Sequence, residues 1–255
     1  MPYIDIKVDN GIAVLGIDRQ EALNALNRDL VDELDARIES IAADENVRVL
    51  VLYSKKHFAA GADIKNMVDL SEDEAKAFAF SKTFNKIEDL SIPTIAAIEG
   101  YALGGGLELA LACDMRIAAP EAKLGFPETG LGIMPGAGGT ARAARLTGPA
   151  KAMELILLGT IIGAEEALRI GLINQLSESD DVLDLALKWA GKLAKGAPIA
   201  LKTAKETIRK GLLEADVQRA VEIESVNWAK LFNTEDQKEG MRAFIEKRKP
   251  AYQGK

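Results

Sequence analysis

Three consecutive glycines, Gly104 to Gly106, constrain the fold more than any other feature of the sequence. They follow a short apolar strand expected over residues 95–98 and precede a run of strong helix formers. Inside a helix, each glycine would cost about 1 kcal/mol relative to alanine. Glycines at this point therefore indicate a place where backbone must closely approach another group. A helix that begins here directs unpaired N–H groups, and the positive end of its dipole, into that space.

Glu108 lies three residues after Gly105, which places it one turn along the same face of the expected helix. An N–H donor and a carboxylate would then border one small volume, which indicates a catalytic site. A glycine-rich turn that serves only close packing, beside a solvated glutamate that complements the helix dipole, is the alternative. The rest of the chain has to distinguish these two interpretations.

Composition limits the possible functions. The 255 residues, 48% of them apolar, are enough for one large domain with an appendage. A net charge of −7 disfavours a broad nucleic-acid or anionic-membrane surface. Cys113 and His57, the single cysteine and histidine, are too few for a disulfide framework or a zinc site, and they weaken any Ser–His proposal. With no leader pattern and no apolar run near ~18 residues, we expect a soluble, cytoplasmic protein without a metal or a membrane span.

The order of periodic patterns predicts an α/β fold built from β/α units. Strands are expected over 3–8, 12–17, 47–53, 95–98, 115–118 and 123–126, with a hairpin turn at residues 9–11. Helical patterns before residue 149 cover 27–41, 71–90 and 140–146. From residue 149 onward the pattern is nearly all helical, over 150–158, 164–170, 181–194, 198–213, 215–232 and 235–246. We expect a core of residues 1–196 and a C-terminal helical segment of residues 197–255.

Two glycine clusters could suggest a nucleotide-binding loop, but neither fits. The stretch from Gly130 to Pro135 begins like a dinucleotide fingerprint and has proline where the third glycine belongs. The stretch from Gly132 to Thr140 contains no Gly-Lys-Ser/Thr, so it lacks the lysine of a phosphate-binding loop. We therefore predict no nucleotide site at either place.

Four segments instead suggest one site: residues 58–64 after a buried strand, 104–108, 126–130 with Glu128, and 134–140. Together they resemble the crotonase (enoyl-CoA hydratase/isomerase) superfamily, and the resemblance extends from Ile4 to about Tyr252. The matching stretches are residues 19–27 (RQEALNALN), 58–64 (FAAGADI), 100–114 (GYALGGGLELALACD), 125–128 (GFPE), 135–140 (PGAGGT), 239–244 (EGMRAF) and 249–250 (KP). Gln20 departs from the family, which usually has proline there.

The resemblance implies a crotonase-like ββα spiral core with a C-terminal helical trimerisation segment, assembled as a homotrimer or a dimer of trimers. It implies that the N–H groups of Ala62 and Gly105 bind the thioester carbonyl of an acyl-CoA. By the same transfer, the residues that contact coenzyme A are Ala25, Leu26, Ala60, Ala62, Asp63 and Ile64. Weaker candidates for its adenine and phosphate end are Phe232, Phe244 and Lys249. Candidates for the acyl pocket, for each of which core packing is the simpler explanation, are Met67, Leu70, Phe78, Leu107 and Met134.

Hydratases of this superfamily resemble one another in having two glutamates, at the positions of Glu108 and Glu128. We therefore expect a fatty-acid-metabolising (β-oxidation) lyase that adds water reversibly to a short- or medium-chain 2-enoyl-CoA. It would need no cofactor besides the coenzyme A of its substrate. Two carboxylates that flank one water can share the acid and base steps. Our hypothesis is that Glu108 orients and deprotonates the water and that Glu128 protonates the α-carbon.

Several alternatives remain open at this stage. The enzyme could be an enoyl-CoA isomerase, or a hydratase for a branched or dicarboxylic acyl-CoA. One branch of the family combines hydration with RNA binding through a lysine-rich helix. Here the matching helix, residues 27–41, has five acidic residues and two arginines, which is the wrong balance for phosphate contacts. A catalytically silent subunit of a larger β-oxidation assembly is disfavoured because both glutamates are present.

Overall fold

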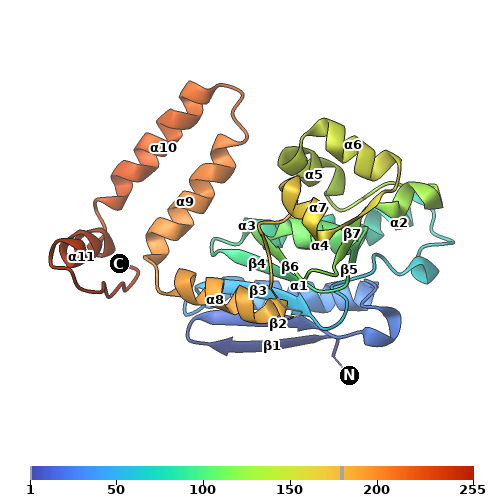
Figure 1. The fold of residues 1–255 in the computed structure, drawn as a ribbon, viewed down its shortest axis with the longest axis horizontal. Coiled ribbons are helices and arrows are strands. Elements are labelled where there is room, and N and C mark those ends of the chain that lie inside the picture. The colour runs from blue at the N-terminus through green and yellow to red at the C-terminus, as the bar shows by residue number, and fades with distance from the viewer. Residues whose placement is uncertain (1, 179–180) are drawn as a thin grey trace.

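A six-stranded sheet lies at the centre of this computed structural model, which describes residues 2–178 and 181–255 (Figure 1). In spatial order its strands are β1 (Ile4–Asp9), β2 (Ile12–Ile17), β3 (Val49–Ser54), β4 (Thr94–Ile98), β6 (Met115–Ala118) and β9 (Gln175–Leu176). The first pair is antiparallel, and all later neighbours are parallel. Asn10 and Gly11 both have positive φ at the β1–β2 turn, 49° and 78°. This geometry suits a tight hairpin, so the predicted hairpin is confirmed.

A second, smaller sheet contains β5 (Tyr101–Leu103), β7 (Lys123–Gly125) and β8 (Ile161–Gly163). The chain passes from β4 in the main sheet to β5 in the small sheet and then into α4 (Gly105–Ala112). It repeats this route from β6 to β7, followed by the 3-10 helix η3 (Pro127–Leu131) and α5 (Gly139–Thr147). This alternation is the repeated ββα arrangement that the family resemblance implied, and the predicted fold class is confirmed.

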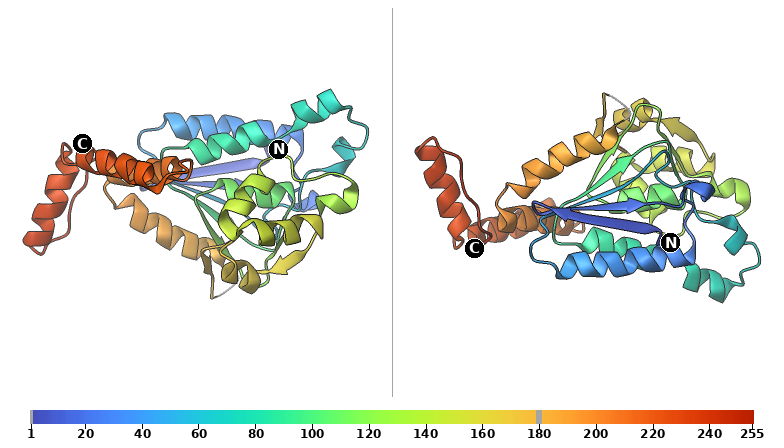
Figure 2. Two further views of the ribbon diagram at one scale, coloured as in Figure 1. Left: turned by 90° about the horizontal axis from the view of Figure 1, so that it is seen from above. Right: turned by 90° about the horizontal axis from the view of Figure 1, so that it is seen from below.

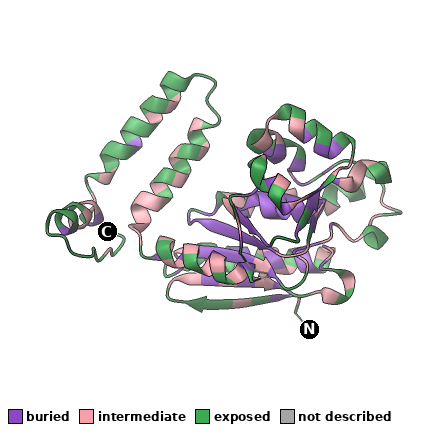
Figure 3. Cartoon of the chain, in the orientation of Figure 1, coloured by how far each residue is buried: buried purple, intermediate pink, exposed green. Residues whose placement is uncertain are grey.

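The central strands bury both faces. Leu50 and Leu52 of β3 point into the larger core, which also includes buried residues of α1 (Arg28–Ala43), α3 (Ser81–Asp89) and α4. Val49 and Val51 point the other way and pack with α8 (Val182–Ala194). A strand covered on both faces needs apolar residues at every position, which is why residues 49–53 form a continuous apolar run. Figure 3 shows this buried centre in purple.

The C-terminal helices α9 (Pro198–Gly211), α10 (Val217–Leu231) and α11 (Glu235–Ile245) extend away from the core (Figures 1 and 2). Their surfaces are mostly exposed in this single chain (Figure 3). Lys205 of α9 ties them to the core, because its Nζ lies 2.7 Å from Asp114 Oδ2 and donates to the Ile92 carbonyl at 2.9 Å. The boundary at residue 196/197 stays a prediction. Among the described residues, no helix is both long and apolar enough to cross a membrane.

The structure corrects three details of the predicted elements. The helical pattern over 71–90 forms two helices, α2 (Glu72–Phe78) and α3, because Ala79 between them is non-helical with ψ 129°. The nearly all-helical prediction after residue 149 missed β8 and β9, although α6 (Pro149–Leu157) and α7 (Ala164–Arg169) agree with it. The sequence also missed β5 and the short 3-10 helices η1 (Gln20–Ala22) and η2 (Ile64–Asn66).

Candidate active site

Glu108 is buried, not solvated. Its side chain points from the first turn of α4, which begins after Gly104 takes a positive φ of 50°, and the residue is 3% exposed. Oε1 accepts hydrogen bonds from the N–H groups of Ala137 and Gly139, both at 2.7 Å. Burial raises the pKa of Glu108, and these N–H groups together with the charge of Arg142 oppose that rise. The carboxylate is therefore held in one position by the loop that leads into α5.

Glu128 lies in η3, where it is less buried than Glu108 and has fewer hydrogen bonds. Its Oε2 is buried without a hydrogen-bond partner in the described part of the chain. A methyl group added at Gly104 would lie 2.8 Å from Oε1 of Glu128, so the carboxyl group sits directly over the start of α4. Burial raises the pKa of Glu128 to about 7, and the negative charge of Glu108 adds to the rise. Near neutral pH this carboxyl group is about half protonated, so it can donate a proton.

Two backbone N–H groups approach each other at the same end of α4. Ala62 forms an isolated parallel bridge with Leu26, and a methyl group added at Gly105 would lie 3.5 Å from the Ala62 nitrogen. Among the described residues, neither the Ala62 N–H nor the Gly105 N–H donates to a protein acceptor. Unpaired N–H donors at a helix start are suited to bind an oxyanion. The structure thus brings these two predicted donors together.

The predicted coenzyme A loops are fastened to each other. The Leu26 N–H donates to the Gly61 carbonyl, and the Asp63 N–H donates to the Leu26 carbonyl, both at 2.8 Å. Arg19 lies across both loops, with 2.8 Å to Asp63 Oδ2 and 2.7 Å to the Ala25 carbonyl. Ala25, Ala60, Ala62 and Asp63 are partly exposed, Ile64 is 46% exposed, and Leu26 is fully buried. Leu26 therefore contributes backbone hydrogen bonds and no exposed surface.

The weaker candidates fall into two groups. Phe232, Phe244 and Lys249 belong to or follow the C-terminal helices. These helices lie at the opposite end of the molecule from α6, which packs against η3 (Figure 1). Within one chain the structure does not bring them to the glutamates. Of the acyl-pocket candidates, Leu107 is fully buried in the core and Met134 is 67% exposed, while Met67, Leu70 and Phe78 are half-buried.

Sequence reasoning missed Arg142, which lies on α5 directly under the loop that binds Glu108. The residue is 8% exposed, and its Nη1 donates to the Ala137 carbonyl at 2.9 Å. An arginine on the buried face of a helix that follows a glycine loop was the available signal. In the part of the chain that the structure describes, no group of three or more His, Cys, Asp or Glu side chains is placed to hold a metal ion.

The spiral fold, with one buried and one partly buried carboxyl group beside unpaired N–H donors, defines a crotonase-type protein. The sequence model for enoyl-CoA hydratase/isomerase matches residues 7–255. The chain is 44% identical over 248 residues to the short-chain-enoyl-CoA hydratase of Clostridium acetobutylicum, covering 96% of this chain and 95% of the relative. It is 43% identical over 250 residues to the crotonyl-CoA hydratase of Syntrophomonas wolfei, covering 96% of each.

A solved structure of similar shape is the enoyl-CoA hydratase from Bacillus anthracis, with a TM-score of 0.95 and 38% identity over 99% of this chain and 100% of that one. The chain belongs to the enoyl-CoA hydratase/isomerase family. The predicted superfamily and the predicted activity type, an enoyl-CoA hydratase of the hydro-lyase class, are confirmed. The roles of individual residues stay predictions.

Proposed function

We propose that the chain adds water reversibly across the 2,3 double bond of a short- or medium-chain 2-enoyl-CoA to give the 3-hydroxyacyl-CoA. The observation that carries this proposal is the pair Glu108 and Glu128, two carboxyl groups in different environments at the start of one helix. The reaction needs a base for water and an acid for the α-carbon, and two such groups can supply both. The reaction needs no cofactor besides the coenzyme A that the substrate carries.

The Ala62 and Gly105 N–H groups bind the thioester oxygen in this proposal. Attack at the β-carbon moves negative charge onto that oxygen in an enolate-like transition state. Donors already in place stabilise this charge without reorganising, and losing one typically raises the barrier by about 3 kcal/mol. Their free N–H groups in the described structure support this role.

Glu108 is the base and Glu128 the acid. Two N–H groups on Oε1 favour the ionised form of Glu108 and leave its other oxygen available to orient a water molecule. As the water oxygen bonds to the β-carbon, Glu108 takes its proton. Glu128, whose pKa is about 7, delivers a proton to the α-carbon. The cycle closes when the proton held by Glu108 returns to Glu128. The reverse sequence gives dehydration.

We propose that residues 197–255 form a trimerisation segment and that the protein is a homotrimer or a dimer of trimers. Large apolar side chains are exposed along α9–α11 in the single chain: Ile208 65%, Val217 75%, Trp228 63%, Phe244 85% and Ile245 77%. Apolar surface of this extent is typical of a protein interface. Light scattering after size exclusion should give a multiple of three chains. A cytoplasmic location and the absence of nucleic-acid partners stay predictions.

The kinetic test compares Glu108→Gln and Glu128→Gln in the hydration of crotonyl-CoA, followed by the loss of enoyl-thioester absorbance. Each change should lower kcat by about 100-fold or more, because it removes a general acid or base. Glu121→Gln is the matched control, since Glu121 is exposed in the turn before β7. Near wild-type rates in both glutamate variants would refute the assignment. A chain-length series then defines the substrate, and turnover of a 3-enoyl-CoA would indicate isomerisation.

The pH profile gives a second test of the acid. Glu128 must be protonated to deliver its proton, and burial raises its pKa to about 7. We therefore expect kcat/KM for hydration to fall as the pH rises through about 7. A profile that is flat from pH 6 to pH 9 would contradict the role of Glu128 as the acid.

A further inference from the structure

Arg142 fills the space beneath the loop that binds Glu108. Its Nη1 donates to the Ala137 carbonyl at 2.9 Å, while the Ala137 and Gly139 N–H groups point to Glu108. Between them Gly138 has φ 111°, and a methyl group there would lie only 2.0 Å from Nη1 of Arg142. Only glycine fits both the backbone angle and the guanidinium. The loop is thus clamped between Arg142 and Glu108.

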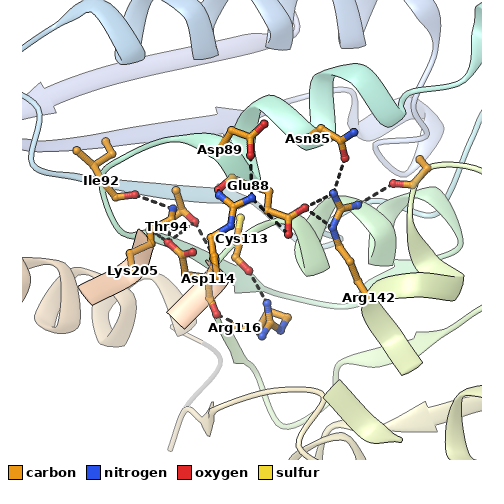
Figure 4. A network of polar contacts seen from close by, with 12 residues as sticks. Asn85, Glu88, Asp89, Ile92, Thr94, Cys113, Asp114, Arg116, Arg142 and Lys205 are labelled. Carbon is orange, nitrogen blue, oxygen red and sulfur yellow. Dashed lines mark hydrogen bonds and ion pairs between the residues drawn. The ribbon is translucent and has the colours of Figure 1, made fainter. Parts of the chain in front are cut away.

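The other edge of the guanidinium is held by α3 (Figure 4). Glu88 Oε2 accepts from Nε of Arg142 at 3.0 Å and from Nη2 at 2.5 Å. Asn85 Oδ1 accepts from Nη2 at 2.7 Å. A planar guanidinium bound along two edges keeps one orientation, and a lysine cannot reproduce this pattern. Arg209 of α9 also lies near Glu88, 3.7 Å from its Oε1.

We propose that Arg142 and Glu88 are positioning residues for Glu108: they hold residues 137–139, and with them the Glu108 carboxylate, in the geometry that proton transfer requires. Neither residue is placed to touch the substrate in the proposed function, on which this inference rests. The chain of contacts runs from Glu88 to Arg142, from Arg142 to the Ala137 carbonyl, and from the adjoining N–H groups to Glu108. Catalysis is sensitive to such supports because small displacements of a reacting group lower the rate strongly.

The same residues set the charge around Glu108. From α5 the positive charge of Arg142 favours the ionised carboxylate, and from η3 Glu128 opposes it. From α3 Glu88 offsets part of the charge of Arg142. On β6 the charged group is Arg116, whose Nη1 donates to the Cys113 carbonyl at the far end of α4. Removing Arg142 and removing the charge of Glu88 should therefore shift the titration of Glu108 in opposite directions.

The test measures kcat, KM and the pH dependence of crotonyl-CoA hydration for Arg142→Met, Arg142→Lys and Glu88→Gln. The acid limb of kcat/KM reports the protonation of Glu108. In Arg142→Met, kcat should fall by about 10-fold or more and the acid limb should move up by about 1 pH unit, because a hydrogen-bonded positive charge is lost. Arg142→Lys should lower kcat with little movement of the limb. Glu88→Gln should lower kcat and move the limb to lower pH.

In all three variants KM should stay close to the wild-type value, because none of them touches the Ala62 and Gly105 N–H groups. Arg145→Met, an exposed position on the same helix, removes an equal charge and should change neither kcat nor the limb. A wild-type kcat and unmoved limb in Arg142→Met would overturn the inference while leaving the hydratase proposal intact. If Arg142→Met does not fold, the inference is overturned by a wild-type kcat in both Glu88→Gln and Arg142→Lys together with an unmoved acid limb in Glu88→Gln. A wild-type protein that does not hydrate 2-enoyl-CoA substrates would instead overturn the proposed function.

Discussion

Replacing Glu128 by glutamine should stabilise the protein, and the gain should grow with pH. The pKa of Glu128 rises from an ordinary 4.5 to about 7 because its carboxyl group is buried. A carboxyl group with a higher pKa in the folded state binds more protons there than in the unfolded chain between these two values. The free energy of unfolding of the wild type therefore falls as the pH rises through this window. Glutamine carries no charge, so the variant avoids this loss.

The magnitude follows from the size of the change in pKa. A rise of about 2.5 corresponds to about 3.4 kcal/mol at 1.36 kcal/mol per pH unit. Glu128 is only partly buried, and solvent screening reduces this upper limit to about 1 to 2 kcal/mol. The loss is complete once the pH is above the folded-state pKa, so the advantage of the variant should be largest at pH 8 and small at pH 5.

Urea unfolding at one fixed protein concentration measures this difference, because oligomer stability depends on concentration. The wild type and Glu128→Gln are compared at pH 5 and pH 8, with Glu121→Gln as the exposed control. The reasoning is refuted if the stability difference between Glu128→Gln and the wild type is equal at the two pH values, or if the variant becomes relatively less stable at pH 8. A stable but inactive variant would indicate that the site keeps a costly carboxyl group for its chemistry.

Two stability predictions concern packing and the attachment of the C-terminal helices. Gly106→Ala should destabilise the fold by about 3 kcal/mol or more, because the added methyl group would lie 2.1 Å from the Ala59 carbonyl oxygen. Gly130→Ala, where a methyl group meets nothing within 4 Å, should change the free energy of unfolding by less than about 0.5 kcal/mol; equal costs at both positions in urea unfolding would contradict the packing argument. Lys205→Met removes the 2.7 Å contact with Asp114 and should cost about 1 to 3 kcal/mol. An unchanged thermal midpoint would show that this ion pair does not fasten α9.

Local signals predicted the elements that carry their own pattern. The apolar run of β3, the Asn10-Gly11 turn and the helix that starts after Gly104 all appear where the sequence indicates. The short strands β5, β8 and β9 were missed because they have only two or three residues each. Such strands exist through pairing with distant segments, as β8 pairs with β7, and no local periodicity reveals them.

By itself, the sequence determined which groups could take part in the chemistry. The glycines before α4, the carboxyl groups of Glu108 and Glu128, and the match to a known family are all properties of the residues in order. Only the tertiary structure decided the pKa values of these carboxyl groups. Burial over the start of α4 raises the pKa of Glu128 to about 7, while two N–H groups above Arg142 oppose the rise that burial causes in the pKa of Glu108. A pKa depends on the dielectric and the charges around a group, and those come from segments far apart in the chain.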